Sequence, residues 1–190
     1  SSGPSAGADS AAAARRSGPG SSRSLAWAGG LLLCALPLLT CRHYWFEHDR
    51  TEFFVARDFA ANMLEPLKPD AILFTNGDND TFPLWYLQQV EKVRKDVTVA
   101  NLSLLNTEWY LRQLRDFAPK VDLGWSDGEI ARLRPYLDAR TQRAVYLKDM
   151  AVHRAIEREY GRRPIYFAAT VPDLMGLEDR LVMQGVAFEL

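Results

Sequence analysis

Short polar side chains are concentrated at residues 76–81, in the sequence NGDNDT, which directly follows the apolar run at 71–75. The carboxylates of Asp78 and Asp80 are suited to accept hydrogen bonds from sugar hydroxyls or to bind a hard cation through oxygen. Gly77 gives the backbone the freedom to turn closely around a ligand. The segment is therefore the strongest candidate for a binding site in this chain.

Two further asparagines belong to the next apolar run, at 97–105: Asn101 lies within it and Asn106 directly follows it. In open parallel sheets, ligands bind outside the carboxyl ends of the strands, so the polar residues that follow successive strands meet at one edge. The rings of Trp85 and Tyr86, one turn further on, would offer an apolar platform for a sugar. The predicted substrate-binding residues are Asn76, Asp78, Asn79, Asp80, Asn101 and Asn106.

The same residue types also serve purely structural purposes. Asp80 or Thr81 would act as the N-cap of a helix that contains Pro83 in its first turn. Asn106 or Thr107 would do the same for the next helix. Sequence alone leaves both interpretations open, a ligand site or helix caps.

Other common chemistries lack their motifs. The three histidines have no metal-ligand spacing, and the chain contains no G-x-G-x-x-G, Walker or G-x-S-x-G sequence. No catalytic residue and no cofactor is therefore predicted. The two cysteines, Cys34 and Cys41, lie in or beside a hydrophobic segment, so the rest of the chain has no disulfide framework and no thiolate zinc site. The net charge of -1 argues against nucleic acid as a partner.

The hydrophobic segment at 25–40 carries no charged residue, and flanking aromatics such as Trp27 and Trp45 bring it to membrane-spanning length. We predict a disordered linker at 1–24, a transmembrane helix at 25–46 and a globular domain at 47–190. Three alternatives are weaker. A secretory signal lacks an A-x-A-like cleavage site, and a lipoprotein signal at Cys41 would have the poorly fitting Thr40 before the cysteine. A buried core helix is disfavoured by the polar linker ahead of the segment.

Three arginines precede the segment, whereas the two that follow are mixed with acidic residues. This bias favours a cytoplasmic N-terminus and places the globular domain on the extracytoplasmic side, the periplasm of a bacterial envelope. The chain opens with Ser rather than Met, as expected of a fragment or a processed piece.

Periodicity predicts a Rossmann-like α/β domain, with a mainly parallel sheet and helices on both faces. Residues 57–67, for example, place Phe59, Met63, Leu64 and Leu67 on one helical face. The predicted helices are 57–67, 82–94, 107–117 and 148–160, and the predicted strands are 71–75, 97–105, 164–170 and an edge strand at 186–190. Residues 118–147 are expected to be irregular.

Three blocks carry a family resemblance: TNGDNDTFPLWYLQ at 75–88, DVTVANLSLLNTEWYLRQL at 96–114 and RRPIYFAATV at 162–171. They resemble domain-of-unknown-function family 2723, whose members look like GT-C membrane glycosyltransferases and are similar to a eukaryotic transmembrane protein O-mannosyltransferase. The resemblance covers about residues 45–190. The resemblance implies many membrane helices ahead of this region. It also implies that the catalytic acidic residue of the family lies in an early extracytoplasmic loop between those helices, outside this chain.

The resemblance implies an extracytoplasmic C-terminal domain of a membrane glycosyltransferase that uses a lipid-linked sugar and a protein or glycan acceptor. This domain would be a non-catalytic portion, either binding the acceptor or bracing the upstream transmembrane region. Its expected partners are the membrane, that upstream region and the acceptor. The alternative is a non-enzymatic, membrane-anchored binding or scaffold module.

Overall fold

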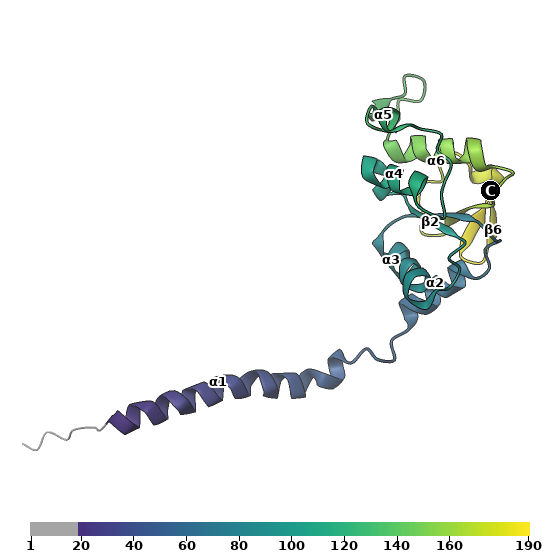
Figure 1. Cartoon of the computed structure of the whole chain (residues 1–190). Helices are drawn as coiled ribbons and strands as arrows, with labels where there is room; N and C mark the ends of the chain where they lie inside the picture. Colours follow the sequence, from purple (N-terminus) through teal and green to yellow (C-terminus); the bar gives the residue numbers. More distant parts are fainter. Residues whose placement is uncertain (1–18) are drawn as a thin grey trace, which may run out of the picture. The chain divides into compact units, whose positions relative to one another are not determined.

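The computed structural model of the chain describes residues 19–190, so most of the linker predicted at 1–24 lies outside the described residues. The chain divides into two units, Ser1–Glu52 and Phe53–Leu190. The first holds a single long helix, and the second holds the sheet and the remaining helices (Figure 1).

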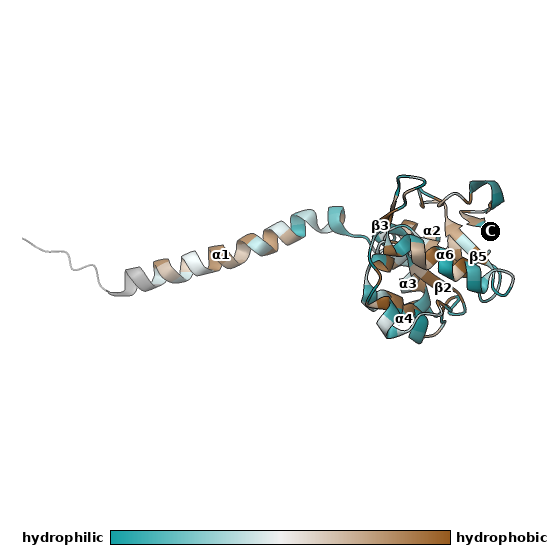
Figure 2. Ribbon diagram, turned by 90° about the horizontal axis from the view of Figure 1, so that it is seen from above, coloured by the Kyte–Doolittle hydropathy of each residue, from teal (hydrophilic) through white to brown (hydrophobic). Residues whose placement is uncertain are grey.

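Helix α1 (Pro19–His48) extends beyond both ends of the predicted 25–46 segment. Its portion Ser24–His48 is 25 residues long and apolar enough to cross a membrane by length and composition, and none of it is buried. Figure 2 shows hydrophobic residues along the middle of α1 and hydrophilic ones toward its C-terminal end. The helix could therefore anchor the chain in a membrane.

The second unit is built on a five-stranded sheet in the order β2-β1-β5-β7-β6. Its strands are β1 (Ile72–Thr75), β2 (Thr98–Asn101), β5 (Ile165–Ala168), β6 (Val182–Gln184) and β7 (Ala187–Glu189). Strands β2, β1 and β5 are parallel, while β7 runs antiparallel to β5 and β6 antiparallel to β7. The fold is thus mixed α/β with a mixed sheet; the finer description as Rossmann-like stays a prediction.

The prediction that residues 186–190 form an edge strand is wrong in position. Strand β7 lies inside the sheet. The edge is formed by β6, which was not predicted from the sequence. The two strands are joined by a tight hairpin in which Gln184 pairs with Ala187. Gly185 adopts a φ of 62°, a left-handed conformation that glycine accepts without steric cost.

Helices cover both sides of the sheet (Figure 1), with α2 (Val55–Leu64) and α3 (Asp78–Tyr86) on one side and α4 (Glu108–Asp116) and α6 (Leu147–Glu159) on the other. Residues 118–147 are less irregular than predicted. They contain the short helix α5 (Asp127–Ile130) and an antiparallel pair of two-residue strands, β3 (Tyr136–Leu137) and β4 (Ala144–Val145). Such short elements bury too few residues to leave a periodic signal.

Helix α3 begins four residues before the predicted start at residue 82, so Pro83 lies inside it rather than in its first turn. Proline has no backbone N–H, and the helical hydrogen bond to the Asn79 carbonyl cannot form. The helix continues directly into a π-helical turn, η1 (Leu87–Glu91).

Strand β1 is the centre of the core. All four of its residues are buried, and the ring of Phe74 lies 5.2 Å from that of Phe167 in the neighbouring β5. A parallel strand covered on both faces needs such a continuous apolar run, which is why this strand was predictable.

The outer edge of β2 is occupied by side chains. The amide of Gln88 donates to the carbonyl of Val97 at 2.8 Å. The hydroxyl of Tyr110 accepts from the backbone N–H of Asn101 at 3.1 Å and donates to the carbonyl of Val99 at 3.3 Å. Both side chains replace the hydrogen bonds that a further strand would make.

Arg94 closes the C-terminal end of α2. Its guanidinium donates to four backbone carbonyls, those of Leu64, Glu65, Leu67 and Lys68. It also forms an ion pair with Asp96, with 2.9 Å between Nη2 and Oδ2. The hydrogen bonds from Arg94 lower the pKa of the Asp96 carboxyl to about 2. The pair thus satisfies carbonyls that the end of a helix leaves without partners.

We expect this ion pair to make the free energy of unfolding depend on pH below about 4, the ordinary pKa of an aspartate in an unfolded chain. Because the folded pKa is depressed to about 2, the stabilisation is complete above the unfolded pKa and disappears as the pH falls through the folded value. Denaturant melts of the chain and of Asp96→Asn in detergent should therefore converge as the pH is lowered. A stability difference that does not change with pH would contradict this prediction.

Candidate functional site

The carboxylate of Asp80 joins the ends of two strands. Asp80 is the third residue of α3 and only 3% exposed. Its two oxygens accept hydrogen bonds from the backbone N–H groups of Asn76 and Gly77, each at 3.0 Å. The hydroxyl of Thr170, which follows β5, donates to the same carboxylate at 2.5 Å. The loop after β1 is therefore fixed to the segment after β5.

Gly77 is the N-cap of α3, so the expectation that Asp80 or Thr81 fills this position is wrong by several residues. Since glycine has no side chain, only one half of a capping box forms, the bond from Asp80 back to the N-cap N–H. A Cβ placed on Gly77 would meet no atom within 4 Å.

A second group of buried polar side chains lies behind this loop. The hydroxyls of Thr75 and Thr81 are 2.6 Å apart, and the amide nitrogen of Asn101 donates to Thr81 at 2.9 Å. The amide oxygen of Asn101 accepts from the backbone N–H of Leu104 at 3.0 Å. The Asn101 amide is thus fully buried and engaged on both its oxygen and its nitrogen.

A hollow of about 600 Å³ lies over the ends of β1 and β5, and we name it the sheet-end hollow. It is lined by Phe53, Val55, Ala56, Phe59, Asn76, Gly77, Asn79, Asp80 and Thr170. One wall is apolar and comes from α2 and from Phe53, two residues before it. The other is polar and comes from the loop after β1 and from the residue that follows β5.

This combination suits a neutral ligand that is rich in hydroxyl groups. Apolar and aromatic walls with a few polar groups are typical of small-molecule sites. The exposed side chains of Asn76 and Asn79 can donate to and accept from hydroxyls. Asp80 is the one ionisable residue of the lining, and both of its oxygens are already bonded. No lysine or arginine of the lining is present to neutralise a phosphate.

Three of the six predicted site residues line the sheet-end hollow: Asn76, Asn79 and Asp80. Asp78 is exposed and lies outside the lining, while Asn101 is buried behind it. Asn106 is exposed and accepts from the backbone N–H of Lys148 at 3.2 Å, so it caps the start of α6. A substrate-binding role for these residues stays a prediction.

Thr107, one of the two residues predicted as the N-cap of α4, does occupy that position. Its side chain makes no capping bond, because the hydroxyl donates to the Leu104 carbonyl at 2.7 Å.

The sequence did not predict the apolar wall of the sheet-end hollow. Trp85, one of the two aromatics expected to form the sugar platform, lines a different hollow, and Tyr86 does not line the sheet-end hollow. The signal that marks the true wall is the run Phe53-Phe54-Val55, whose side chains are more than half exposed.

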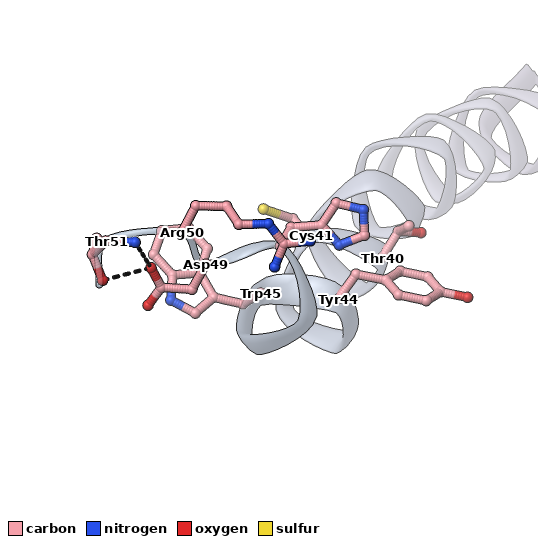
Figure 3. A pocket seen from close by; sticks show the side chains of 8 residues that line it. Thr40, Cys41, Tyr44, Trp45, Asp49, Arg50 and Thr51 are labelled. Carbon is pink, nitrogen blue, oxygen red and sulfur yellow. Dashed lines mark hydrogen bonds between the residues drawn. The ribbon is translucent and has the colours of Figure 1, made fainter. Parts of the chain in front are cut away.

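Another hollow, of about 730 Å³, lies within the first unit and is lined by residues of the segment 40–51 (Figure 3). Every residue of that segment is exposed. A hollow formed by one exposed stretch of chain lacks the packed walls of a preformed site, so we do not take it as the functional site.

A metal centre is not apparent in the described part of the chain. Among residues 19–190, no group of three or more His, Cys, Asp or Glu side chains is placed to hold a metal ion. The bonds that Asp80 already makes also leave it poorly suited to join Asp78 as a cation ligand.

Part of the second unit is similar in sequence to known proteins. Residues 56–126 match the family model described as TMEM260-associated domain 2. The protein O-mannosyl-transferase TMEM260 of Mus musculus is 30% identical over 99 residues, which make up 52% of this chain and 14% of the mouse protein. No solved structure matches the chain. Both matches support a relation to TMEM260, whereas membership of domain-of-unknown-function family 2723 stays a prediction.

The contacts of Asp80 and Asp78 lead to opposite expectations for stability. Asp80→Ala should lower the free energy of unfolding by about 3 kcal/mol, because it leaves two backbone N–H groups and a hydroxyl without their acceptor. That exceeds the cost of about 1 kcal/mol for losing a helix cap alone. Asp78→Ala, at an exposed position of the same helix, is the matched control and should melt like the parent chain. Thermal melts in detergent that give the two variants equal stability would contradict this role of Asp80.

Proposed function

We propose that this chain is the extracytoplasmic C-terminal part of a membrane glycosyltransferase and that its second unit binds the acceptor. The observation that carries the proposal is the match of residues 56–126 to a TMEM260-associated domain. The matched residues include the loop after β1 and all of α2 except Val55, and they supply six of the nine residues that line the sheet-end hollow. The region of similarity therefore overlaps most of the candidate site.

The proposed reaction follows from the printed name of the mouse relative, an O-mannosyl-transferase. We propose transfer of a sugar, mannose in the first instance, from a lipid-linked donor to a hydroxyl of a protein or glycan acceptor. The chain aligns with 14% of the mouse protein, so the activity of a whole transferase is part of the proposal.

Binding rather than catalysis is the role that the sheet-end hollow supports. A catalytic acid or base must reach the reacting hydroxyl and exchange a proton with it. The single carboxylate of the lining, that of Asp80, is committed to holding the loop after β1. The exposed amides and the aromatic wall are suited to hold a sugar or a hydroxylated peptide while the upstream membrane region performs the transfer.

The experiment measures mannose transfer in membranes that contain the full-length protein, with a lipid-linked mannose donor and a serine- and threonine-rich peptide. Asn79→Ala should raise the KM for the acceptor by about tenfold, equivalent to about 1.4 kcal/mol, with little change in kcat. Phe117→Ser alters another exposed side chain, at the end of α4 and outside the lining, and should leave KM unchanged.

Equal KM values for the parent, Asn79→Ala and Phe117→Ser would refute acceptor binding at the sheet-end hollow. Absence of transfer by the unaltered protein, with peptide or glycan still bound, would instead favour the alternative of a non-enzymatic membrane-anchored module.

Placement on the extracytoplasmic side is a separate part of the proposal, supported by the three arginines that precede the hydrophobic segment at 25–40. Alkaline phosphatase fused after Leu190 should be active in a bacterial host, because this enzyme acquires its disulfides only outside the cytoplasm. An inactive phosphatase together with a fluorescent cytoplasmic reporter at the same position would reverse the orientation.

A further inference from the structure

A run of large apolar side chains is exposed at the start of the second unit. Phe53, Phe54, Val55 and Phe59 are 66%, 53%, 64% and 36% exposed, and we name them the α2 apolar patch. Contiguous exposed side chains of this size mark a surface that contacts a partner or a membrane. Three of the four also belong to the apolar wall of the sheet-end hollow.

The α2 apolar patch is distinct from the hydrophobic core, because other residues of α2 are the ones that pack into the interior. Ala60, Met63 and Leu64 of the same helix are completely buried. The helix therefore has one apolar surface that packs against the domain and another that does not. Only the second is available for a partner.

The tether limits where that partner can be. Helix α1 ends at His48 and α2 begins at Val55, so residues 49–54 are all that separates the two helices. Even fully extended, such a segment reaches no more than about 25 Å. It is not fully extended, since the backbone N–H and the hydroxyl of Thr51 both donate to the carboxylate of Asp49, at 3.0 and 2.7 Å (Figure 3).

The C-terminal end of α1 has the features of a membrane–water interface. The candidate span of 25 residues is about 37 Å long at 1.5 Å per residue, longer than a hydrocarbon core of about 30 Å. Tyr44, Trp45 and Phe46 are exposed near this end, and aromatic residues of this kind are enriched at the headgroup level. The short linker thus starts at the bilayer surface.

We propose that the α2 apolar patch inserts into the boundary between headgroups and acyl chains of the bilayer that holds α1. The inference rests on the membrane placement of α1 in the proposed function and not on sugar transfer. The mouth of the sheet-end hollow then lies at the lipid surface. An acceptor bound there would be held close to a sugar donor that is itself anchored in the membrane.

Insertion is driven by apolar contact rather than by charge. Arg57, the basic residue of α2, is engaged by Glu91 through two hydrogen bonds of 2.9 and 2.7 Å, and its other neighbour is Asp58. The charges beside the patch are therefore mixed and mutually satisfied. They form no cluster of Lys and Arg of the kind that recognises anionic lipids.

The experiment places a nitroxide label at one site at a time in the full chain, reconstituted in phosphatidylcholine vesicles. Cys34 and Cys41 are replaced by serine, and a single cysteine is introduced by Ala56→Cys beside the patch or by Ala139→Cys in the β3–β4 loop. Both alanines are exposed, so they are matched sites. A label at Ala56→Cys should collide more with oxygen and less with a water-soluble nickel chelate than the label at Ala139→Cys.

Two further arms test the cause. Phe53→Ser together with Phe54→Ser should return the label at Ala56→Cys to the nickel accessibility of the Ala139→Cys reference. Phe117→Ser, which removes an exposed phenylalanine elsewhere, should have no effect. Addition of phosphatidylglycerol should leave the depth unchanged, and a depth that requires this anionic lipid would overturn insertion by apolar contact.

A chain labelled only at Cys34 reports separately on α1. If that label lies among the acyl chains while the Ala56→Cys label is as wet as the reference, the membrane placement stands and the insertion is overturned. If the Cys34 label is itself in water, the membrane placement of α1 and the insertion of the patch are both overturned. An Ala56→Cys label shielded from oxygen and nickel alike would show that protein, not lipid, covers the patch, and would also overturn the inference.

Discussion

One buried carboxylate determines the arrangement of the candidate site. Asp80 draws the backbone of the loop after β1 and the hydroxyl after β5 onto the same pair of oxygens. A carboxylate that is 3% exposed is tolerated only because these bonds offset the loss of its hydration. The positions of Asn76 and Asn79, which face the sheet-end hollow, follow from that requirement. The shape of the candidate site therefore depends on hydrogen bonds within the protein.

The central strands could be predicted because their sequence obeys a simple constraint. The apolar runs at 71–75 and 164–170 closely match β1 and β5, since strands of a sheet covered on both faces must be apolar throughout. The run at 97–105 contains β2, but that strand ends at Asn101, and the prediction is wrong for the rest of the run, which enters a 3-10 helix at Leu104–Asn106. Helix starts were less predictable. The preference of proline for a first turn suggested a start at residue 82, but the backbone N–H of Gly77 donates to the carboxylate of Asp80, and α3 begins earlier. Both signals are local, and the capping bond between residues three apart prevailed over the preference of proline.

The candidate site was only partly predictable for a related reason. Asparagine and aspartate look alike in a sequence whether they meet a ligand or bond within the fold. Asn101 is buried by partners on other elements, and Thr170 lies 90 residues from the carboxylate that it contacts. Helical periodicity also placed Phe59 on the same face as Met63, yet Phe59 is 36% exposed and Met63 is completely buried. Periodicity defines an apolar face but does not say what covers it.

The side chains along the outer edge of β2 have a consequence for a protein confined to a surface. Tethered domains diffuse in two dimensions and meet at high local concentration, where an open strand edge invites pairing between neighbours and aggregation. Gln88 and Tyr110 already occupy outward-facing groups of β2 and of the residue before it. The opposite edge, β6, is only three residues long. One edge of the sheet is thus occupied by side chains and the other is short, and both features disfavour recruitment of further strands when domains are crowded.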